Sequence, residues 1–329
     1  MSRSTFSSVW TQFHPPKPGF TEQDLQDLHG KIYIVTGSNT GVGKELAQIL
    51  YAKNAKVYVA ARSEDKAKEA IKAIKKTVPN STGELVFLHL DLNDLTTIKA
   101  SSESFLSKET KLHVLFNNAG VMTPPQGSKT AQGYEMQLGV NNIGTFMFTK
   151  LLTQMLVSTA RTEPQNTVRV VWVSSSATEL LSPQPGGVPM DNLDYHIERS
   201  STYKYGVSKA GNFLHAAEFA KRYKPDGIIS VALNPGNLSS EIQRYQGMLT
   251  KLILRIIQYP PKNGAYTELF AGLSPNITIE KSGDWIIPFG RFLPIRKDMI
   301  DATKTEAEGG TGVGLKFWEW CEEQIKPYI

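Results

Sequence analysis

The sequence predicts an α/β fold, a doubly wound parallel sheet of about seven strands in a single domain. Short apolar, β-branched runs alternate along the chain with longer charged segments of helical period, a pattern typical of βαβ units joined by right-handed crossovers. No break in composition and no long flexible linker divides the 329 residues, and 40% of them are apolar. One large core is therefore expected.

The chain begins with a segment that lacks a sustained period. Residues 1–29 contain Ser, Pro and aromatic residues, so we expect an arm that wraps the surface, with one helical turn over residues 21–28. The main domain is expected to span residues 30–329. Its first strand and helix lie in KIYIVTGSNTGVGKELA, where an apolar run breaks into three glycines and continues as a helix over residues 42–50.

The three glycines of this turn are Gly37, Gly41 and Gly43. Their missing Cβ atoms let the turn bend, let backbone approach a ligand, and let the helix close onto the strand. The free N–H groups at the start of the helix favour an anion such as pyrophosphate. No Gly-Lys-Ser/Thr follows, which excludes the simplest NTPase, whereas a glycine-rich turn without a ligand stays open.

The later elements continue the alternation. A charged helix over residues 63–77 ends before Pro79, and another helix runs to about Lys108. Helical segments are also expected at residues 142–156, at 205–223 and at the C-terminus, where Trp318 and Trp320 pack the last helix down. The further expected strands are residues 55–62, 85–90, 113–116, 168–173, 229–233 and 285–288.

Composition excludes several classes of function. The net charge of +5 is spread thinly, and its one cluster, at Lys72, Lys75 and Lys76, has no interleaved aromatic residues, so nucleic acid is not an expected partner. The single cysteine, Cys321, excludes an internal disulfide and makes structural zinc improbable. His89, His113 and His215 fall in core-like segments and are expected to be satisfied structural residues. We expect no metal.

The N-terminus has no continuous apolar core, so neither a secretory signal nor a membrane anchor is predicted and the cytoplasm is expected. The apolar stretch MLTKLILRIIQY, residues 248–259, carries Lys251 and Arg255 on one side. It has two interpretations, a helix that dips into a membrane surface or a lid over a substrate. We favour a helical lid over about residues 238–260 and expect no stable membrane insertion.

Polar side chains follow the strands, at the edge where open parallel sheets bind ligands. Asn117 ends the fourth strand, Asn141 lies further along, and Ser174, Ser175 and Ser176 follow the fifth. Next come Tyr205 and Lys209, whose i to i+4 spacing places them on one face of a helix. A Tyr-x-x-x-Lys pattern alone is also typical of an ordinary pair of side chains on a protein surface.

A phenol beside an ammonium group has a chemical use. The ordinary tyrosine pKa is about 10, and lowering it towards neutrality requires about 4 kcal/mol of preferential phenolate stabilisation. The Lys209 ammonium and a cationic nicotinamide ring could supply it.

Four motifs in this order carry a resemblance: Thr36-Gly37-Ser38-Asn39-Thr40-Gly41-Val42-Gly43, Asn117-Asn118-Ala119-Gly120, Tyr205-x-x-x-Lys209 and Asn234-Pro235-Gly236, with Asn141 and Ser175 between them. Over residues 31–240 the chain resembles the short-chain dehydrogenase/reductase family, especially fungal members of its retinol-dehydrogenase-like branch. The resemblance implies a Rossmann-type fold, an NAD(P) cofactor and hydride transfer to a carbonyl or from an alcohol.

The resemblance also implies roles for single residues. Tyr205 would be the general acid/base, Lys209 its electrostatic partner and a ribose ligand, Ser175 the group that polarises the substrate oxygen, and Asn141 the holder of a relay water. Ser175 is favoured over its two serine neighbours by the VSSxA pattern. The expected cofactor-binding residues are Gly37, Ser38, Asn39, Thr40, Gly41, Val42, Gly43, Arg62, Asp91, Leu92, Asn118, Ala119, Gly120, Tyr205, Lys209, Pro235, Gly236, Leu238 and Ser240.

Two departures from the family pattern are visible. The family usually has Pro-Gly-x-Val-x-Thr, whereas this chain has PGNLSS, so Ser240 would supply the hydroxyl that binds the nicotinamide carboxamide. Retinol-dehydrogenase-like relatives often begin with a membrane anchor, which is not expected here, so we do not expect a retinoid substrate.

The cofactor expected from the residues is NADP(H). The second strand ends in Ala61 and not in a carboxylate, and Arg62 follows, whose guanidinium can hold a 2′-phosphate by two parallel hydrogen bonds. Ser38, Asn39 and Ser63 could add neutral bonds, while Asp91 would contact the adenine. The alternative is that Arg62 merely lies in solvent.

We therefore expect a metal-independent carbonyl reductase or alcohol dehydrogenase. Apolar residues of the predicted lid suggest a lipophilic substrate. A homodimer is compatible with the helices at residues 142–156 and 205–223. The competing interpretation is a non-catalytic NADP(H)-sensing interaction protein on the same fold, which would need none of the proton-transfer groups.

Overall fold

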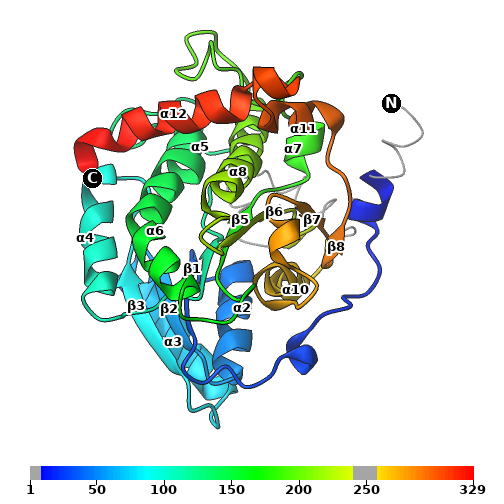
Figure 1. The fold of residues 1–329 in the computed structure, drawn as a ribbon. Coiled ribbons are helices and arrows are strands. Elements are labelled where there is room, and N and C mark those ends of the chain that lie inside the picture. Colours follow the sequence, from blue (N-terminus) through cyan, green and yellow to red (C-terminus); the bar gives the residue numbers. More distant parts are fainter. Residues whose placement is uncertain (1–8, 240–257) are drawn as a thin grey trace.

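Eight strands form one sheet in the order β3-β2-β1-β4-β5-β6-β7-β8 in a computed structural model that describes residues 9–239 and 258–329 (Figure 1). All pairings from β3 to β7 are parallel, and β8 runs antiparallel to β7. The predicted doubly wound parallel fold is confirmed. The strand count is one higher than expected, because Arg291–Phe292 is too short to leave a pattern in the sequence.

The predicted strands lie where the sequence placed them, within one or two residues at each end. Except in the edge strand β3, their central residues are buried, as a sheet covered on both faces requires. The strands are β1 Ile32–Thr36, β2 Lys56–Ala61, β3 Glu84–His89, β4 Val114–Asn117, β5 Arg169–Val173, β6 Ile229–Leu233, β7 Trp285–Ile287 and β8 Arg291–Phe292.

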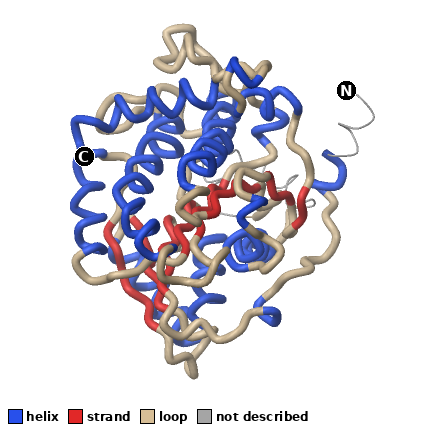
Figure 2. Tube along the Cα trace, in the orientation of Figure 1, coloured by secondary structure: helices blue, strands red, loops and turns tan. Residues whose placement is uncertain are grey.

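Helices cover both faces of the sheet, which forms a single twisted layer in Figure 2. One core packs the sheet against α2, α3 and α10, and the other packs it against α4, α6 and α8, with α12 outside α8. The helices are α2 Gly41–Ala52, α3 Glu64–Thr77, α4 Leu95–Leu106, α5 Met136–Leu138, α6 Thr145–Ala160, α7 Ala177–Leu180, α8 Ser201–Tyr223, α10 Pro261–Leu273, α11 Lys297–Thr303 and α12 Val313–Ile325.

The strand order reverses between β1 and β4. Helices on opposite faces leave this point, so a crevice forms outside the carboxyl ends of the two strands. The register places the carboxyl ends of neighbouring strands at the same level. Thr36 of β1 lies opposite Ala60 of β2, Asn117 of β4 opposite Trp172 of β5, and Val173 of β5 opposite Leu233 of β6. The residues that follow these strands therefore meet at one edge.

The N-terminal arm is tied to the domain at both of its described ends. Residues 9–13 are helical, and Arg291 of β8 donates to the Thr11 carbonyl oxygen at 2.7 Å. Nearer the first strand, Glu22 pairs with Lys262 of α10 at 2.8 Å. The helical turn expected over residues 21–28 is a shorter 3₁₀ turn, Glu22–Asp24, capped by Thr21.

Most of the predicted lid, residues 240–257, lies outside the described residues. Its two flanks meet, because Leu238 forms a parallel bridge with Tyr259. No helix in the described ranges is both long and apolar enough to span a membrane.

The histidines differ from the expectation in two cases. His113 is satisfied, since its Nδ1 accepts from the Ile32 N–H at 2.9 Å. His89 is exposed because it ends the edge strand β3. His215 is fully buried among aromatic rings, and neither ring nitrogen has a partner within the described parts of the chain, so it is not a satisfied residue. Burial lowers the pKa of His215 to about 3, so the ring is neutral.

The lone cysteine is structural. Cys321 lies on the inner face of α12 with 0% exposure, and burial raises the pKa of its thiol well above the ordinary value. A buried, protonated thiol is chemically inert.

Candidate active site

The glycine-rich turn between β1 and α2 has the geometry that its sequence predicts. Gly37 and Gly41 adopt φ values of +67° and +57°, which disfavour side chains. Gly43 is needed for space, because a Cβ there would lie 2.5 Å from Asn118 Nδ2 and 3.0 Å from the Gly37 carbonyl oxygen. The helix can thus begin directly against the turn, with its free N–H groups at the crevice.

A second turn, after β4, is tied to the first. The Asn118 amide donates to the Thr36 carbonyl oxygen at 2.7 Å, and the Ala119 N–H donates to the Thr36 hydroxyl at 2.9 Å. Asn117 points the other way and donates to the Thr149 hydroxyl at 2.9 Å. The two turns therefore form one rigid floor across the point where the strand order reverses.

Asn141 lies in an irregular helical turn. Residues Gly139–Gly144 form a π-helical turn between α5 and α6, a geometry that is rare and concentrated at functional sites. The Asn141 amide accepts from the Val121 N–H at 2.8 Å and donates to the Ser208 hydroxyl at 3.0 Å. Its side chain thus joins the loop after β4 to α8, and nothing in the sequence pattern predicted the π turn.

Tyr205 and Lys209 lie one turn apart on α8, and both are buried. The Lys209 ammonium donates to the Val173 carbonyl oxygen at 2.9 Å, and its Nζ lies 5.8 Å from the centroid of the Tyr205 ring. A Cβ added to Gly120 would lie 3.3 Å from this Nζ and 3.1 Å from Asn141 Oδ1. The structure therefore brings Tyr205, Lys209 and Asn141 together at the carboxyl edge.

The three serines after β5 have different partners. The Ser174 hydroxyl is buried and donates to the Lys209 carbonyl oxygen at 2.6 Å, so it fastens α8 to the sheet. The Ser175 hydroxyl accepts from the Ala177 N–H at 3.2 Å and lies close enough to the Tyr205 hydroxyl to lower the pKa of that phenol. Ser176 precedes α7 and makes no cap bond. Of the three, Ser175 faces Tyr205.

The electrostatics of the pair differ from the simple expectation. Burial raises the pKa of Tyr205 to about 12, and the hydrogen bond from Ser175 opposes this only in part. Burial also lowers the pKa of Lys209 to about 8, opposed by the charge of Glu268. In the protein alone burial dominates and the phenol stays protonated, so a positive charge acting on it is needed to lower its pKa.

The end of β2 has the expected charge pattern. Ala61 is buried, Arg62 is exposed, and no carboxylate occupies either position. One expected neutral contact is corrected, because the buried Ser38 hydroxyl donates to the Val35 carbonyl oxygen at 2.6 Å and turns away from the surface. Further along, Asp91 accepts from the Asn93 N–H at 3.0 Å and so shapes its own turn.

The Pro-Gly turn after β6 holds partners that sequence reasoning missed. The Asn234 amide donates to Gln12 of the N-terminal arm at 2.9 Å, and Gln12 donates to the Glu179 carboxylate at 2.6 Å. Gly236 has φ +107°. No spacing in the sequence links residue 12 to residue 234. The expected Ser240 lies outside the described residues.

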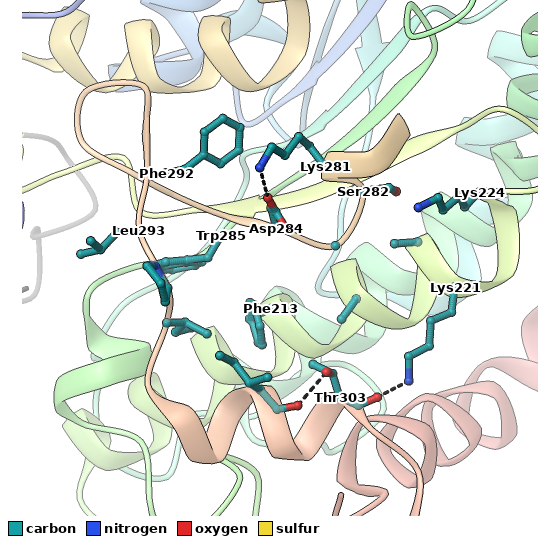
Figure 3. A pocket seen from close by; sticks show the side chains of 16 residues that line it. Phe213, Lys221, Lys224, Lys281, Ser282, Asp284, Trp285, Phe292, Leu293 and Thr303 are labelled. Atoms are coloured by element: carbon teal, nitrogen blue, oxygen red, sulfur yellow. Dashed lines mark hydrogen bonds and ion pairs between the residues drawn. The ribbon is translucent and has the colours of Figure 1, made fainter. Parts of the chain in front are cut away.

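A cavity of about 640 Å³ lies elsewhere (Figure 3). It is lined by the far end of α8 and by β7, β8 and α11, including Phe213, Trp285 and Lys224. None of the expected site residues that the structure describes lines it. Nor do the described residues hold any group of three His, Cys, Asp or Glu side chains that could bind a metal.

Comparison with known proteins places this geometry in context. The family model described as short chain dehydrogenase matches residues 31–187. A short-chain dehydrogenase/reductase from Phomopsis amygdali is 54% identical over 333 residues, covering 100% of this chain and 99% of that protein.

Two solved structures show the same fold. NADPH-bound carbonyl reductase from chicken fatty liver has a TM-score of 0.58 and 21% identity, over 79% of this chain and 96% of that one. The 3-ketoacyl-(acyl-carrier-protein) reductase from Brucella melitensis, complexed with NADH, has a TM-score of 0.58 and 20% identity, over 77% and 95%.

Proposed function

The chain belongs to the short-chain dehydrogenase/reductase family, and from that premise we propose that it transfers hydride between NADP(H) and a lipophilic carbonyl or alcohol, with Tyr205 as general acid/base. The observation that carries the proposal is the arrangement of Ser175, Tyr205 and Lys209. The Ser175 hydroxyl is near enough to the phenol to lower its pKa, and a buried ammonium lies one helical turn away, at the carboxyl edge of the sheet. A protein that only binds a cofactor needs no such set.

The glycine-rich turn fits a dinucleotide. Because Gly37 and Gly43 lack a Cβ, the turn packs tightly against Ala119 and Asn118 and α2 begins directly at the turn. The N–H groups at such a helix start favour a pyrophosphate. The other expected cofactor residues that the structure describes follow strands at the carboxyl edge of the sheet or lie on α8. When bound, the nicotinamide supplies or accepts the hydride and, once oxidised, carries a positive charge.

NADP(H) is proposed over NAD(H) on the charges at the end of β2. Arg62 is exposed there, and no carboxylate repels a 2′-phosphate. The two solved relatives carry different cofactors, so they do not decide the choice.

The side chains have distinct parts in carbonyl reduction. Tyr205 donates its proton to the substrate oxygen, and Ser175 donates a hydrogen bond to the same oxygen as charge develops there. The Lys209 ammonium stabilises the resulting phenolate. Asn141, which joins the loop after β4 to α8, would hold the water that returns a proton to Tyr205. No other acid is required.

The substrate class rests on the sequence. The apolar residues of the predicted lid lie outside the described residues, and they favour a substrate with an apolar body. Following NADPH consumption with carbonyl compounds of graded polarity tests this class. We expect the longer apolar aldehydes and ketones to have the highest kcat/KM, and a preference for small charged substrates would refute it.

Tyr205→Phe tests the catalytic assignment. Loss of a general acid should lower kcat by about 10²- to 10⁴-fold, while NADPH binding, followed by its fluorescence, is retained. Tyr203→Phe is the matched control, because it removes a hydroxyl from the same helix, two residues away. Unchanged turnover in Tyr205→Phe would exclude the catalytic assignment of Tyr205, whereas wild-type protein that binds NADPH but reduces no carbonyl compound would favour the cofactor-sensing alternative.

A further inference from the structure

The short helix of the N-terminal arm, residues 9–13, contacts the domain through polar side chains. Of these five residues only Gln12 is buried, with 3% exposure, whereas the large apolar side chain of Trp10 is 58% exposed. Hydrophobic packing alone would bury the indole and leave the carboxamide in water. The arm is therefore held by directional hydrogen bonds, which fix a position and do not merely cover apolar surface.

The Gln12 carboxamide uses both of its ends. Its Nε2 donates to the Glu179 carboxylate at 2.6 Å, and its Oε1 accepts from the Asn234 amide at 2.9 Å. Asn234 is buried and Glu179 is half-buried. One side chain of the arm thus bridges two segments of the domain.

Both of the bridged segments carry expected site residues. Glu179 lies on α7, four residues after Ser175. Asn234 begins the Pro-Gly turn, and its Oδ1 accepts from the Gly236 N–H at 3.1 Å. The Asn234 side chain therefore closes the turn with its oxygen and is held by the arm through its nitrogen.

Thr11 contributes a second connection to the same turn. The guanidinium of Arg291, in β8 beside the arm (Figure 1), donates to the Thr11 hydroxyl at 2.8 Å and to its carbonyl oxygen at 2.7 Å. Arg291 Nε also donates to the Pro288 carbonyl oxygen at 2.8 Å. Phe289, the next residue, packs on the turn, since a Cβ added to Gly236 would lie 3.0 Å from its Cε1. Two neighbouring residues of the arm thus hold the turn by separate sets of hydrogen bonds.

We propose that the N-terminal arm completes the active site, with Gln12 as a positioning residue that fixes the Pro-Gly turn relative to Ser175. The inference rests on the proposed function, in which Ser175 binds the substrate oxygen and the Pro-Gly turn contacts the cofactor. Hydride transfer needs substrate and cofactor in a set geometry, so a shift of about 1 Å between the two segments lowers turnover. Gln12 itself touches neither substrate nor cofactor in this account.

Gln12→Met keeps the length of the side chain but removes both hydrogen bonds. We expect kcat/KM for carbonyl reduction to fall by about 10- to 100-fold, mainly through kcat. NADPH affinity, followed by fluorescence, should be retained because the glycine-rich turn keeps its own contacts. Glu22→Gln is the matched control, since it loosens the same arm at Lys262 and should leave kcat/KM unchanged.

An exchange of two side chains provides a rescue. In the double variant Gln12→Glu with Glu179→Gln, the carboxylate and the carboxamide change places, so both hydrogen bonds can form again. We expect this variant to recover most of the kcat/KM that Gln12→Met loses. Gln12→Glu alone brings two carboxylates together and should remain impaired.

Hydrogen exchange of the Gly236 N–H reports on the turn without cofactor or turnover. We expect it to be about tenfold faster in Gln12→Met and slow again in the double variant, because a loosened Asn234 no longer protects this amide. If wild-type enzyme reduces no carbonyl compound, the proposed function fails, and the exchange rates still test how the arm holds the turn. Exchange in Gln12→Met as slow as in wild type, or equal losses of kcat/KM in Gln12→Met and Glu22→Gln, would overturn the inference.

Discussion

Two groups of charged residues, one at each end of the parallel sheet, differ in whether their members have ion-pair partners among the described residues. At the amino end, Glu163 forms ion pairs with Lys111 at 2.6 Å and with Lys31, and His113 Nε2 lies 3.5 Å away. At the carboxyl end, Lys209 has only neutral hydrogen-bond partners, and Glu268 has none among the described residues.

This difference separates stability from function. At the amino end Glu163 is paired with two lysines, as expected of a cluster that contributes to stability. The carboxyl end leaves a lysine and a glutamate buried and lets burial move both pKa values towards neutrality, where proton transfer is useful. Substitutions at the two ends should therefore have opposite effects on activity and on stability.

Lys209→Met should have the largest effect on activity. We expect kcat/KM to fall by about 10²- to 10⁴-fold, without loss of thermal stability, because the buried ammonium disappears and the Val173 carbonyl oxygen still accepts from Asn212 at 3.0 Å. Kinetics and thermal unfolding measure the two quantities. A large drop in the melting temperature would mean that the carboxyl end is built for stability as well.

Arg62→Ala tests the cofactor side of the carboxyl end. A charge-assisted hydrogen bond contributes about 1.5 to 3 kcal/mol, so NADPH should bind about 10- to 150-fold more weakly. NADH affinity should hardly change. Titrations with both cofactors, in wild type and variant, measure this, and equal losses for the two would show that Arg62 does not bind the phosphate.

Gly43→Ala places a methyl group against Asn118 Nδ2 and the Gly37 carbonyl oxygen. Overpacking of this kind costs about 1 to 3 kcal/mol, and NADPH affinity should fall with stability. Gly19→Ala is the control, since nothing lies within 4 Å of a Cβ there. Chemical denaturation compares the two, and equal stability would mean that the turn accommodates a side chain.

Glu163→Gln at the amino end should show the opposite pattern to Lys209→Met. We expect kcat/KM to be unchanged and the free energy of unfolding to fall by about 1 to 2 kcal/mol, a modest value because Lys31 and Lys111 are 35% and 40% exposed. A loss of activity without a loss of stability would contradict the division between the two ends.

The pH dependence of stability gives the smallest effect. Burial raises the pKa of Glu163, but hydrogen bonds from Lys111 and Lys31 outweigh it and lower the value to about 2. Because this is below the unfolded value of about 4.3, the stabilisation is complete above that pH and is lost as the pH falls towards 2. Melting curves of wild type should therefore fall more steeply over this range than those of Glu163→Gln.

The strands and the glycine-rich turn could be predicted because their causes are local. An apolar run, a positive φ and a helix start each involve a few consecutive residues, so the turn formed by Gly37, Gly41 and Gly43 can be predicted from the local sequence. The i to i+4 spacing of Tyr205 and Lys209 likewise correctly predicted that both side chains lie on one face of a helix.

The remaining features depend on contacts between distant segments. Gln12 meets Asn234 and Glu179 only after the arm has folded over the domain, and Glu268 becomes buried only when α10 packs against the sheet. The Tyr205 pKa also depends on burial, which no spacing reports. Sequence patterns record periodicity but not these long-range partners.

Cys321 has a practical consequence for spectroscopy. Because this single thiol is buried and its pKa is raised, the folded chain presents no native site to maleimide dyes. Ser239 is exposed and follows Asn237 and Leu238 after the Pro-Gly turn, so Ser239→Cys would introduce one addressable position near the carboxyl edge of the sheet. A fluorophore attached there could follow the arrival of NADPH and of substrate in real time, in otherwise unaltered enzyme.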